Sequence, residues 1–111
     1  MHAFDVLGDP VRRRILELLA GDERASGEVV AVIAGEFGIT QAGGSQHLKV
    51  LRDSGFATVR AEGTRRLYAL DSAPLREVDA WLDHVRCCGD HKMMALGTEI
   101  ARGRKQRKRD G

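Results

Sequence analysis

The sequence predicts a mainly α-helical fold that carries one β-hairpin, an α+β class of protein. Apolar residues recur at helical spacing along most of the 111 residues, whereas they alternate at strand spacing between Phe56 and Leu70. Within that alternating stretch, Glu62-Gly63-Thr64 is the predicted turn, because its glycine supplies the positive φ that short hairpins need. The length suits one domain with a modest core.

The first part of the chain predicts a brief helix over residues 2–7 and a longer one that begins at Asp9-Pro10. An aspartate N-cap followed by proline at the first helical position is a strong start signal, and Gly21 ends the helix. Three arginines, residues 12–14, follow this start, and Arg13 is spaced to pair with Glu17 at i, i+4. Two interpretations of the arginines stay open, a solvated face and a phosphate contact.

The next segment predicts two helices close together. A polar turn from Asp22 to Gly27 precedes a helix from Glu28 to about Phe37, which Gly38 closes. Thr40 is a competent N-cap for the following helix, and Gly55 ends it. Two helices joined by a turn of about three or four residues form a helix-turn-helix, and the later hairpin is then a wing. In the helix from Glu28 to about Phe37, the residues expected to face inward are Val29, Val30, Ile33 and Phe37.

The helix after Thr40 is predicted to have one buried and one exposed side. Leu48 and Leu51 are spaced i, i+3 and face inward together with Gly44. A polar helix face beside a hairpin with an arginine-bearing tip is suited to gripping a nucleic-acid duplex. The polar residues of that face are Gln41, Ser45, Gln46 and Lys49.

Pro74 opens the last predicted helix, whose apolar stripe continues to Ile100. This stripe is too long for so small a core to cover, so we expect a partner subunit to cover it and interpret the segment as a long dimerisation helix. The structured domain is therefore expected over residues 1–101. Residues 102–111 carry six basic side chains and one acid, a charge of +5, so the rest of the +2 chain sums to −3. We expect a disordered tail that either solubilises the chain or makes non-specific phosphate contacts.

Several classes of protein lack support in the sequence. No window reaches the roughly 18 apolar residues of a membrane span and no signal peptide opens the chain, so we expect a cytoplasmic protein without membrane contact. No catalytic triad, phosphate-cradling glycine loop or set of paired carboxylates is recognisable, so we expect no enzymatic activity. The two cysteines, Cys87 and Cys88, are adjacent, which is not the disulfide framework of a secreted fold.

Three motifs, in their order and spacing, resemble the ArsR/SmtB-type winged helix-turn-helix regulators of bacteria. They are FDVLGDPVRRRILELL (Phe4–Leu19), SQHLKVLRDSGF (Ser45–Phe56) and EGTRRLYAL (Glu62–Leu70), and the resemblance covers Phe4 to about Ile100. It implies a homodimer, built from the first and last helices, that binds double-stranded DNA at a near-palindromic operator. The two recognition helices would enter successive major grooves about 34 Å apart.

The same resemblance implies which residues contact the DNA. Recognition-helix residues would reach bases and phosphates, and wing arginines would contact the backbone or the minor groove. His47 is interpreted as a packing residue. Steric occlusion of a promoter is the family's common mode, which favours a transcriptional repressor over an activator. The expected DNA-binding residues are Thr40, Gln41, Ser45, Gln46, Lys49, Arg60, Arg65 and Arg66.

A cluster of histidines and cysteines lies within the last predicted helix. Side chains spaced i, i+3, i+7 share a face, which predicts a candidate site for nickel, zinc or another soft or borderline metal ion, with His2 as a further candidate ligand. No cofactor is expected to be required, and the pattern differs from the cysteine pair or Asp-x-His arrangement of metal-sensing relatives. A thiol redox switch and plain packing or surface residues are the alternatives. The candidate ligands are His84, Cys87, Cys88 and His91.

The chain departs from the family at Gly43-Gly44, where a small and then a β-branched residue are common. Two glycines weaken the recognition helix by roughly 1–2 kcal/mol, and the absent valine is expected to leave a hole. We therefore expect a recognition helix that is loose in the free protein and becomes ordered on binding DNA, a ligand or a co-regulator protein. The double substitution Gly43→Ala with Gly44→Val should then tighten operator binding. The alternative is that neighbouring side chains compensate for the glycines. The departure also motivates another function, a winged-helix protein-interaction module with weak or no autonomous DNA binding.

Overall fold

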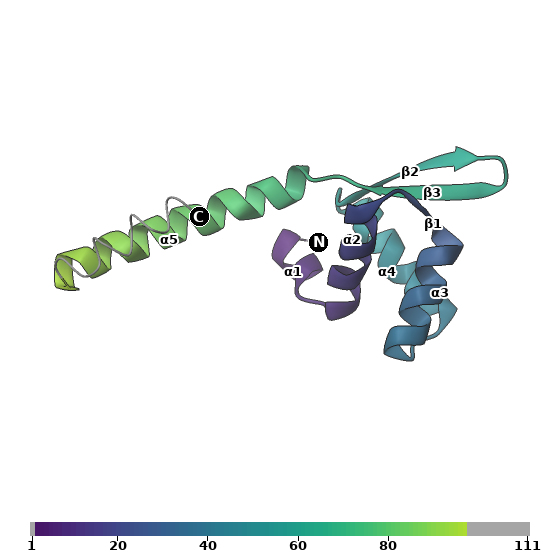
Figure 1. Cartoon of the computed structure of the whole chain (residues 1–111), viewed down its shortest axis with the longest axis horizontal. Coiled ribbons are helices and arrows are strands. Elements are labelled where there is room, and N and C mark those ends of the chain that lie inside the picture. The colour runs from purple at the N-terminus through teal and green to yellow at the C-terminus, as the bar shows by residue number, and fades with distance from the viewer. Residues whose placement is uncertain (1, 98–111) are drawn as a thin grey trace. The chain divides into compact units, whose positions relative to one another are not determined.

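The computed structural model of the protein describes residues 2–97 (Figure 1), and it describes side chains for residues 2–89. It divides into two units, one that ends at Arg76 and one that begins at Glu77, and each is described by itself. The helices are α1 (Ala3–Leu7), α2 (Pro10–Gly21), α3 (Ser26–Phe37), α4 (Gln41–Asp53) and α5 (Ala73–Gly97), and the strands are β1 (Arg24–Ala25), β2 (Ala57–Glu62) and β3 (Arg65–Leu70). Helices plus a small antiparallel sheet of order β1-β3-β2 confirm the predicted fold class.

The predicted helix boundaries are confirmed where a cap residue marks them. The Asp9 Oδ1 atom accepts hydrogen bonds from the backbone N–H groups of Val11 at 2.8 Å and Arg12 at 3.4 Å. The Thr40 Oγ1 atom accepts from the N–H of Gly43 at 3.0 Å. Each side chain satisfies donors that the first helical turn leaves unpaired. The turn between α3 and α4 is three residues long, and Gly38 occupies it with φ of 67°.

The core of the first unit is built from α1 to α4 and the inner face of the hairpin. Its fully enclosed side chains come from four different elements and from the residue before β2, so each element contributes to one shared core. Leu75, near the start of α5, packs against it. The largest fully buried side chains are Phe56, Ile15, Ile33, Leu51, Val6 and Val29.

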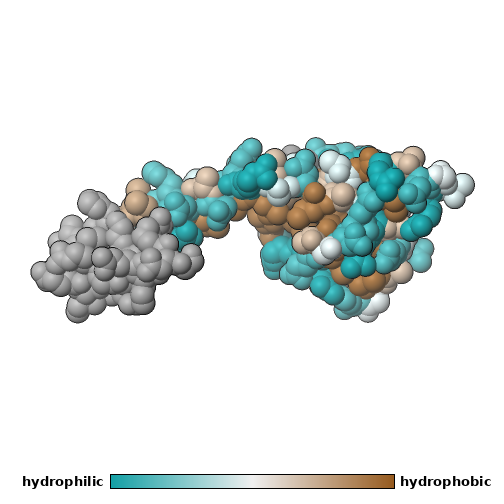
Figure 2. Space-filling view, turned by 45° about the horizontal axis from the view of Figure 1, so that its top comes forward, coloured by the Kyte–Doolittle hydropathy of each residue, from teal (hydrophilic) through white to brown (hydrophobic). Residues whose placement is uncertain are grey.

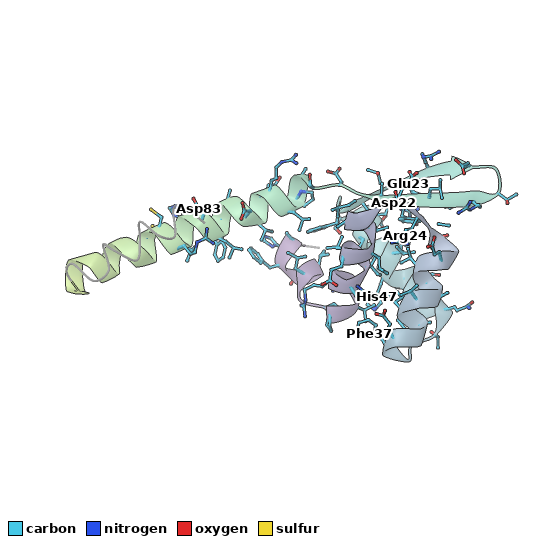
Figure 3. The ribbon with its side chains drawn as sticks, viewed as in Figure 1. Asp22, Glu23, Arg24, Phe37, His47 and Asp83 are labelled. Carbon is cyan, nitrogen blue, oxygen red and sulfur yellow. The ribbon has the colours of Figure 1, made fainter. Side chains whose placement is uncertain are left out.

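Two predictions about the region around α3 are wrong. The expected polar turn from Asp22 to Gly27 contains the short strand β1, in which Arg24 pairs with Tyr68 of β3, and α3 begins at Ser26 rather than Glu28. Phe37, predicted to face inward, is 39% exposed. It is the last residue of α3 (Figure 3), one turn beyond Ile33, which is the last fully buried residue of that helix.

The three arginines of α2 are all engaged within the protein. Arg13 donates to the carbonyl oxygen of Leu7 at 2.7 Å, so the expected pair with Glu17 is wrong. Arg14 instead pairs with Glu17 at 3.3 Å and, through two nitrogens, with Glu36 of α3 at 2.9 and 3.1 Å. These contacts tie α2 to α1 and α3. Arg13 is nevertheless exposed, so the two interpretations, a solvated face and a phosphate contact, both stay predictions.

The pair between Arg14 and Glu36 predicts a loss of stability in acid. Hydrogen bonding from Arg14 lowers the pKa of the Glu36 carboxyl below its ordinary value of 4.5. The contribution is therefore complete above about pH 4.5 and is lost as the pH falls through the lower folded-state pKa. We expect Glu36→Gln to have a slightly lower Tm than the wild type near neutral pH and a smaller difference at about pH 3. Thermal melts across that range measure this, and a difference that does not change with pH would contradict it.

The hairpin has the two predicted strands, but its turn is one residue shorter than predicted because Glu62 belongs to β2. β2 and β3 pair from Ala57 opposite Leu70 to Glu62 opposite Arg65, so Gly63 and Thr64 alone form the turn. Gly63 has φ of 63°, a conformation that side chains rarely adopt, and a two-residue turn of this kind matches the twist of the strands. The base of the hairpin lies on the core through Ala57 and Tyr68, while both residues of its tip are exposed.

The second unit consists of the remainder of α5. Three large apolar side chains of this segment are strongly exposed: Trp81 at 50%, Val85 at 44% and Leu82 at 42%. Figure 2 shows apolar surface, in brown, among the polar surface of the chain. Within residues 2–97, no helix is long and apolar enough to cross a membrane. Ile100 and the basic segment 102–111 lie outside the described residues.

Candidate nucleic-acid interface

α4 presents the polar face that its sequence predicts. Gln41, Ser45, Gln46 and Lys49 are all exposed, whereas Leu48 and Leu51 on the opposite side are 2% and 0% exposed. The buried leucines hold the helix on the core and leave its polar side chains exposed. Glutamine presents an amide that can bind adenine through two hydrogen bonds, and serine can bond several bases. This face is therefore suited to reading base edges.

The two ends of this face are partly engaged. Thr40 caps α4 with its hydroxyl oxygen, which leaves the hydroxyl hydrogen able to donate to a phosphate. Lys49 pairs with Asp53 at 3.2 Å, and this hydrogen bond lowers the pKa of the Asp53 carboxyl. Both residues are exposed, and exposed pairs of this kind are weak. Lys49 therefore remains able to bind a phosphate.

Gly44 lies against α3, and the hole expected beside it is absent. A Cβ atom at this position would lie 3.2 Å from Cγ1 of Val30 and 3.3 Å from Cδ1 of Ile33. Both distances are shorter than ordinary van der Waals contact, so the space that a valine would need is already filled. Neighbouring side chains compensate for the glycine, and the prediction that Gly44→Val fills a cavity is wrong. The close approach sets how deeply α4 sits on α3.

Arg60 in β2 is paired with two carboxylates. Two of its nitrogens donate to the two carboxylate oxygens of Glu23 at 2.8 Å each, and Glu62 lies 3.5 Å away. Hydrogen bonding between them raises the pKa of Arg60 and lowers that of Glu23. Glu23 directly precedes β1 (Figure 3), so this pair ties the wing to the loop between α2 and α3. Arg60 is thus less available to a phosphate than its sequence position indicates.

The side chains of Arg65 and Arg66, near the tip of the wing, are exposed and form no hydrogen bond or ion pair with any of the described residues. They follow one another in β3, so their side chains leave opposite faces of the hairpin. Arg66 also lines a shallow pocket together with Val59, Arg60 and Ala61. Free guanidinium groups on a projecting hairpin can donate to phosphate oxygens or enter a narrow minor groove.

The candidate metal ligands are only partly brought together. The Sγ atom of Cys88 lies 3.9 Å from Nε2 of His84, and both cysteines are free and exposed. Within the described part of the chain, no group of three or more suitable side chains could hold a metal ion. The side chain of His91 lies outside the described residues, and His2 caps α1 through Nδ1. Metal binding therefore stays a prediction.

Two side-chain contacts near the interface have no signal in the sequence, and His47, predicted to be a packing residue, takes part in the first of them. The ring nitrogen Nδ1 of half-buried His47 lies 3.3 Å from Nη1 of Arg12, and Glu23 holds Arg60. Arg12 and His47 are 35 positions apart in the sequence, and Glu23 and Arg60 are 37 positions apart. No local spacing rule indicates such pairs, because only the packing of α2, α4 and the wing brings them together.

Comparisons with known proteins agree with this geometry. Residues 7–60 match a family model described as a helix-turn-helix domain. The HTH-type transcriptional regulator Rv2034 of Mycobacterium tuberculosis is 38% identical over 82 residues, which cover 74% of this chain and 73% of that protein. The transcriptional repressor SdpR of Bacillus subtilis is 28% identical over 92 residues, which cover 83% of this chain and 98% of that protein.

Solved structures of ArsR-family regulators share the fold. Among them is Mb0332 from Mycobacterium bovis, described as a homodimeric winged helix-turn-helix DNA-binding domain of a possible ArsR-family transcriptional regulator. The two sequences are 26% identical, the match covers 82% of this chain and 79% of the M. bovis chain, and the TM-score is 0.57. The chain therefore belongs to the ArsR family of winged helix-turn-helix transcriptional regulators.

Proposed function

We propose that this protein is a homodimeric, sequence-specific DNA-binding transcriptional repressor. The observation that carries the proposal is the exposed polar face of α4 together with the side chains of Arg65 and Arg66 near the tip of the wing, which form no hydrogen bond or ion pair with the described residues. A duplex offers base edges to the first and phosphates to the second. A protein that binds chromosomal DNA in a bacterium works in the cytoplasm, so we place it there, and we assign it no enzymatic activity.

In the proposed complex, α4 enters the major groove and the wing follows the backbone. Gln41, Ser45 and Gln46 read base edges, and Lys49 and the hydroxyl of Thr40 bind phosphates. Arg65 and Arg66 contact the backbone or the adjacent minor groove. Because Arg60 is already paired with Glu23, we give it a different role, that of holding the wing at a fixed angle to the body.

Homodimer formation is supported from two sides. The exposed apolar side chains of α5, Trp81, Leu82 and Val85, form a surface that a second copy of the chain would cover. The M. bovis relative is described as homodimeric. Repression is supported by the description of the B. subtilis relative as a repressor. A twofold dimer would present two α4 helices to a near-palindromic operator.

The alternative function, a protein-interaction module without firm DNA reading, depends on a loose recognition helix. The contacts around Gly44 leave no cavity that would loosen α4, which favours DNA reading. A requirement for a co-regulator protein and a response to nickel, zinc or thiol oxidation stay hypotheses beside the main proposal. Of the candidate ligands, the pair of His84 and Cys88 is the part that the structure brings close.

Selection from a pool of randomised duplexes tests the proposed function. The full chain should enrich a near-palindromic sequence, and fluorescence anisotropy should then show at least about a thousandfold preference for it over a scrambled duplex. Sedimentation velocity on the same sample should show a dimer. Failure to enrich any sequence, or a monomer at the concentrations at which the duplex is bound, would contradict the proposal.

A further inference from the structure

One arginine of α2, Arg12, contacts two other helices of the first unit through its guanidinium group. Its side chain is only 13% exposed. Its Nε atom donates to the carbonyl oxygen of Val6 and its Nη2 atom to that of Asp5, both at 2.9 Å. Its Nη1 atom lies 3.3 Å from Nδ1 of His47 in α4 and 3.8 Å from Oδ2 of Asp9, the N-cap of α2. Arg12 thus joins α1, the first turn of α2 and the middle of α4.

The contacts with α1 fix the position of the guanidinium group. A helix of five residues leaves its last carbonyl groups without partners inside the helix. Arg12 donates to two of them, and Arg13 donates to a third, that of Leu7. Because the guanidinium is planar and rigid, two bonds to α1 determine where the remaining nitrogen points. It points at α4.

His47 receives this contact at a sensitive place in α4. Its neighbour Gln46 is exposed on the face proposed to read bases, and its other neighbour Leu48 is buried in the core. Guanidinium nitrogens donate and never accept, so Nδ1 acts as the acceptor nitrogen of the ring in this contact. A change in the contact would move the backbone that carries Gln46.

We propose that the Arg12–His47 contact positions the recognition helix: it fixes the orientation of α4 on α1 and α2 and thereby sharpens base reading by Gln46. Neither residue is assigned a contact with DNA, and both act through the placement of α4. The effect on DNA rests on the proposed function, whereas the effect on α4 is a property of the free protein. The two effects are therefore tested separately.

Four variants separate this contact from general packing. His47→Leu removes the acceptor and introduces an apolar side chain of similar size. His47→Asn keeps an acceptor close to the position of Nδ1. Arg12→Met removes the contacts with α1, with His47 of α4 and with Asp9. Arg13→Met is the matched control. The Arg13 guanidinium donates to the carbonyl oxygen of Leu7 in α1, whereas the contact with His47 is made by Arg12, so this variant changes α1 alone.

Amide hydrogen exchange on the full chain without DNA tests the positioning of α4. A hydrogen bond of ordinary strength predicts about fivefold faster exchange in α4 of His47→Leu, with α1 unchanged and wild-type exchange in His47→Asn. Arg12→Met should speed exchange in both helices, and Arg13→Met in α1 alone. Unchanged exchange of α4 in His47→Leu, or an asparagine variant no better than the leucine variant, would overturn the inference.

Binding to the duplex selected by the wild type tests the consequence for DNA. His47→Leu should lower the ratio of affinities for the selected and scrambled duplexes about fivefold, with the affinity for the scrambled duplex unchanged, and His47→Asn should restore the ratio. An unchanged ratio of the two affinities, whether both fall to the same extent or neither changes, would overturn this consequence. If the wild type selects no duplex, the proposed function fails, and the exchange experiment still decides the positioning role.

Discussion

Replacing Arg65 and Arg66 together with glutamine should weaken binding to the selected duplex by on the order of 10- to 100-fold. Both side chains are exposed, and within residues 2–89 neither has a partner that would neutralise its charge. An arginine that binds a phosphate releases a counterion, so the slope of log K against log salt should fall in magnitude by about 0.9 for each phosphate that the variant no longer neutralises. Because the change acts on the DNA backbone, it should reduce affinity for selected and scrambled duplexes alike.

A matched control removes the same charge elsewhere. Arg76→Gln with Arg86→Gln also takes two positive charges from exposed positions, but these lie in α5 and not in the wing. Anisotropy titrations at several KCl concentrations should show a shallow slope for the wing variant and a nearly wild-type slope for the control. Equal reductions of affinity in the two variants would mean that total charge, and not the wing, governs binding.

Gly44→Val should destabilise the fold by about 1–3 kcal/mol, the usual cost of adding methyl groups to a packed core. The first added carbon already lies 3.2 Å from Val30 and 3.3 Å from Ile33, and these residues are 7% and 0% exposed, so they have little room to yield. Gly44→Ala should be close to neutral, since its better helix propensity offsets the tighter contact. Urea denaturation measures both free energies of unfolding.

Gly35 in α3 provides the comparison for that experiment. A Cβ atom there would meet nothing within 4 Å, so Gly35→Val changes the same residue type in a helix without crowding. We expect no reduction of stability in this variant and weaker duplex binding only in Gly44→Val, because only that change pushes α4 away from α3. A Gly44→Val protein as stable as the wild type would show that α3 can yield and that the close approach is not needed.

Local signals made much of the fold predictable from the sequence. Asp9-Pro10 and Thr40 mark helix starts through their capping chemistry, and Gly38 and Gly63 adopt the positive φ that ends a helix or forms a turn. The strand β1 escaped prediction because two residues are too few to show alternation, and it exists only through its pairing with β3. Local patterns specify elements, whereas pairing partners depend on the assembled fold.

The candidate site was predictable in its residue types but not in its electrostatics. The spacing of α4 placed Gln41, Ser45 and Gln46 on the exposed face, which the structure confirms. The sequence does not indicate that Arg60 is paired with Glu23, because Glu23 lies in the loop between α2 and α3, far from the wing in the sequence. Likewise, Gly44 in α4 predicts a less stable helix when only the sequence is known, because the sequence does not show that α3 packs closely against this position. Long-range packing decides which charges stay free and which gaps are filled.

Hydroxyl-radical footprinting on the selected duplex tests the central claim most directly, namely that two copies of α4 enter consecutive major grooves of one DNA site. We predict two protected windows, symmetric between the strands and centred about 10 base pairs apart on one face of the duplex. The wing arginine variant should lose protection mainly at the outer edges of both windows. A single window, or protection without twofold symmetry, would contradict this mode of binding.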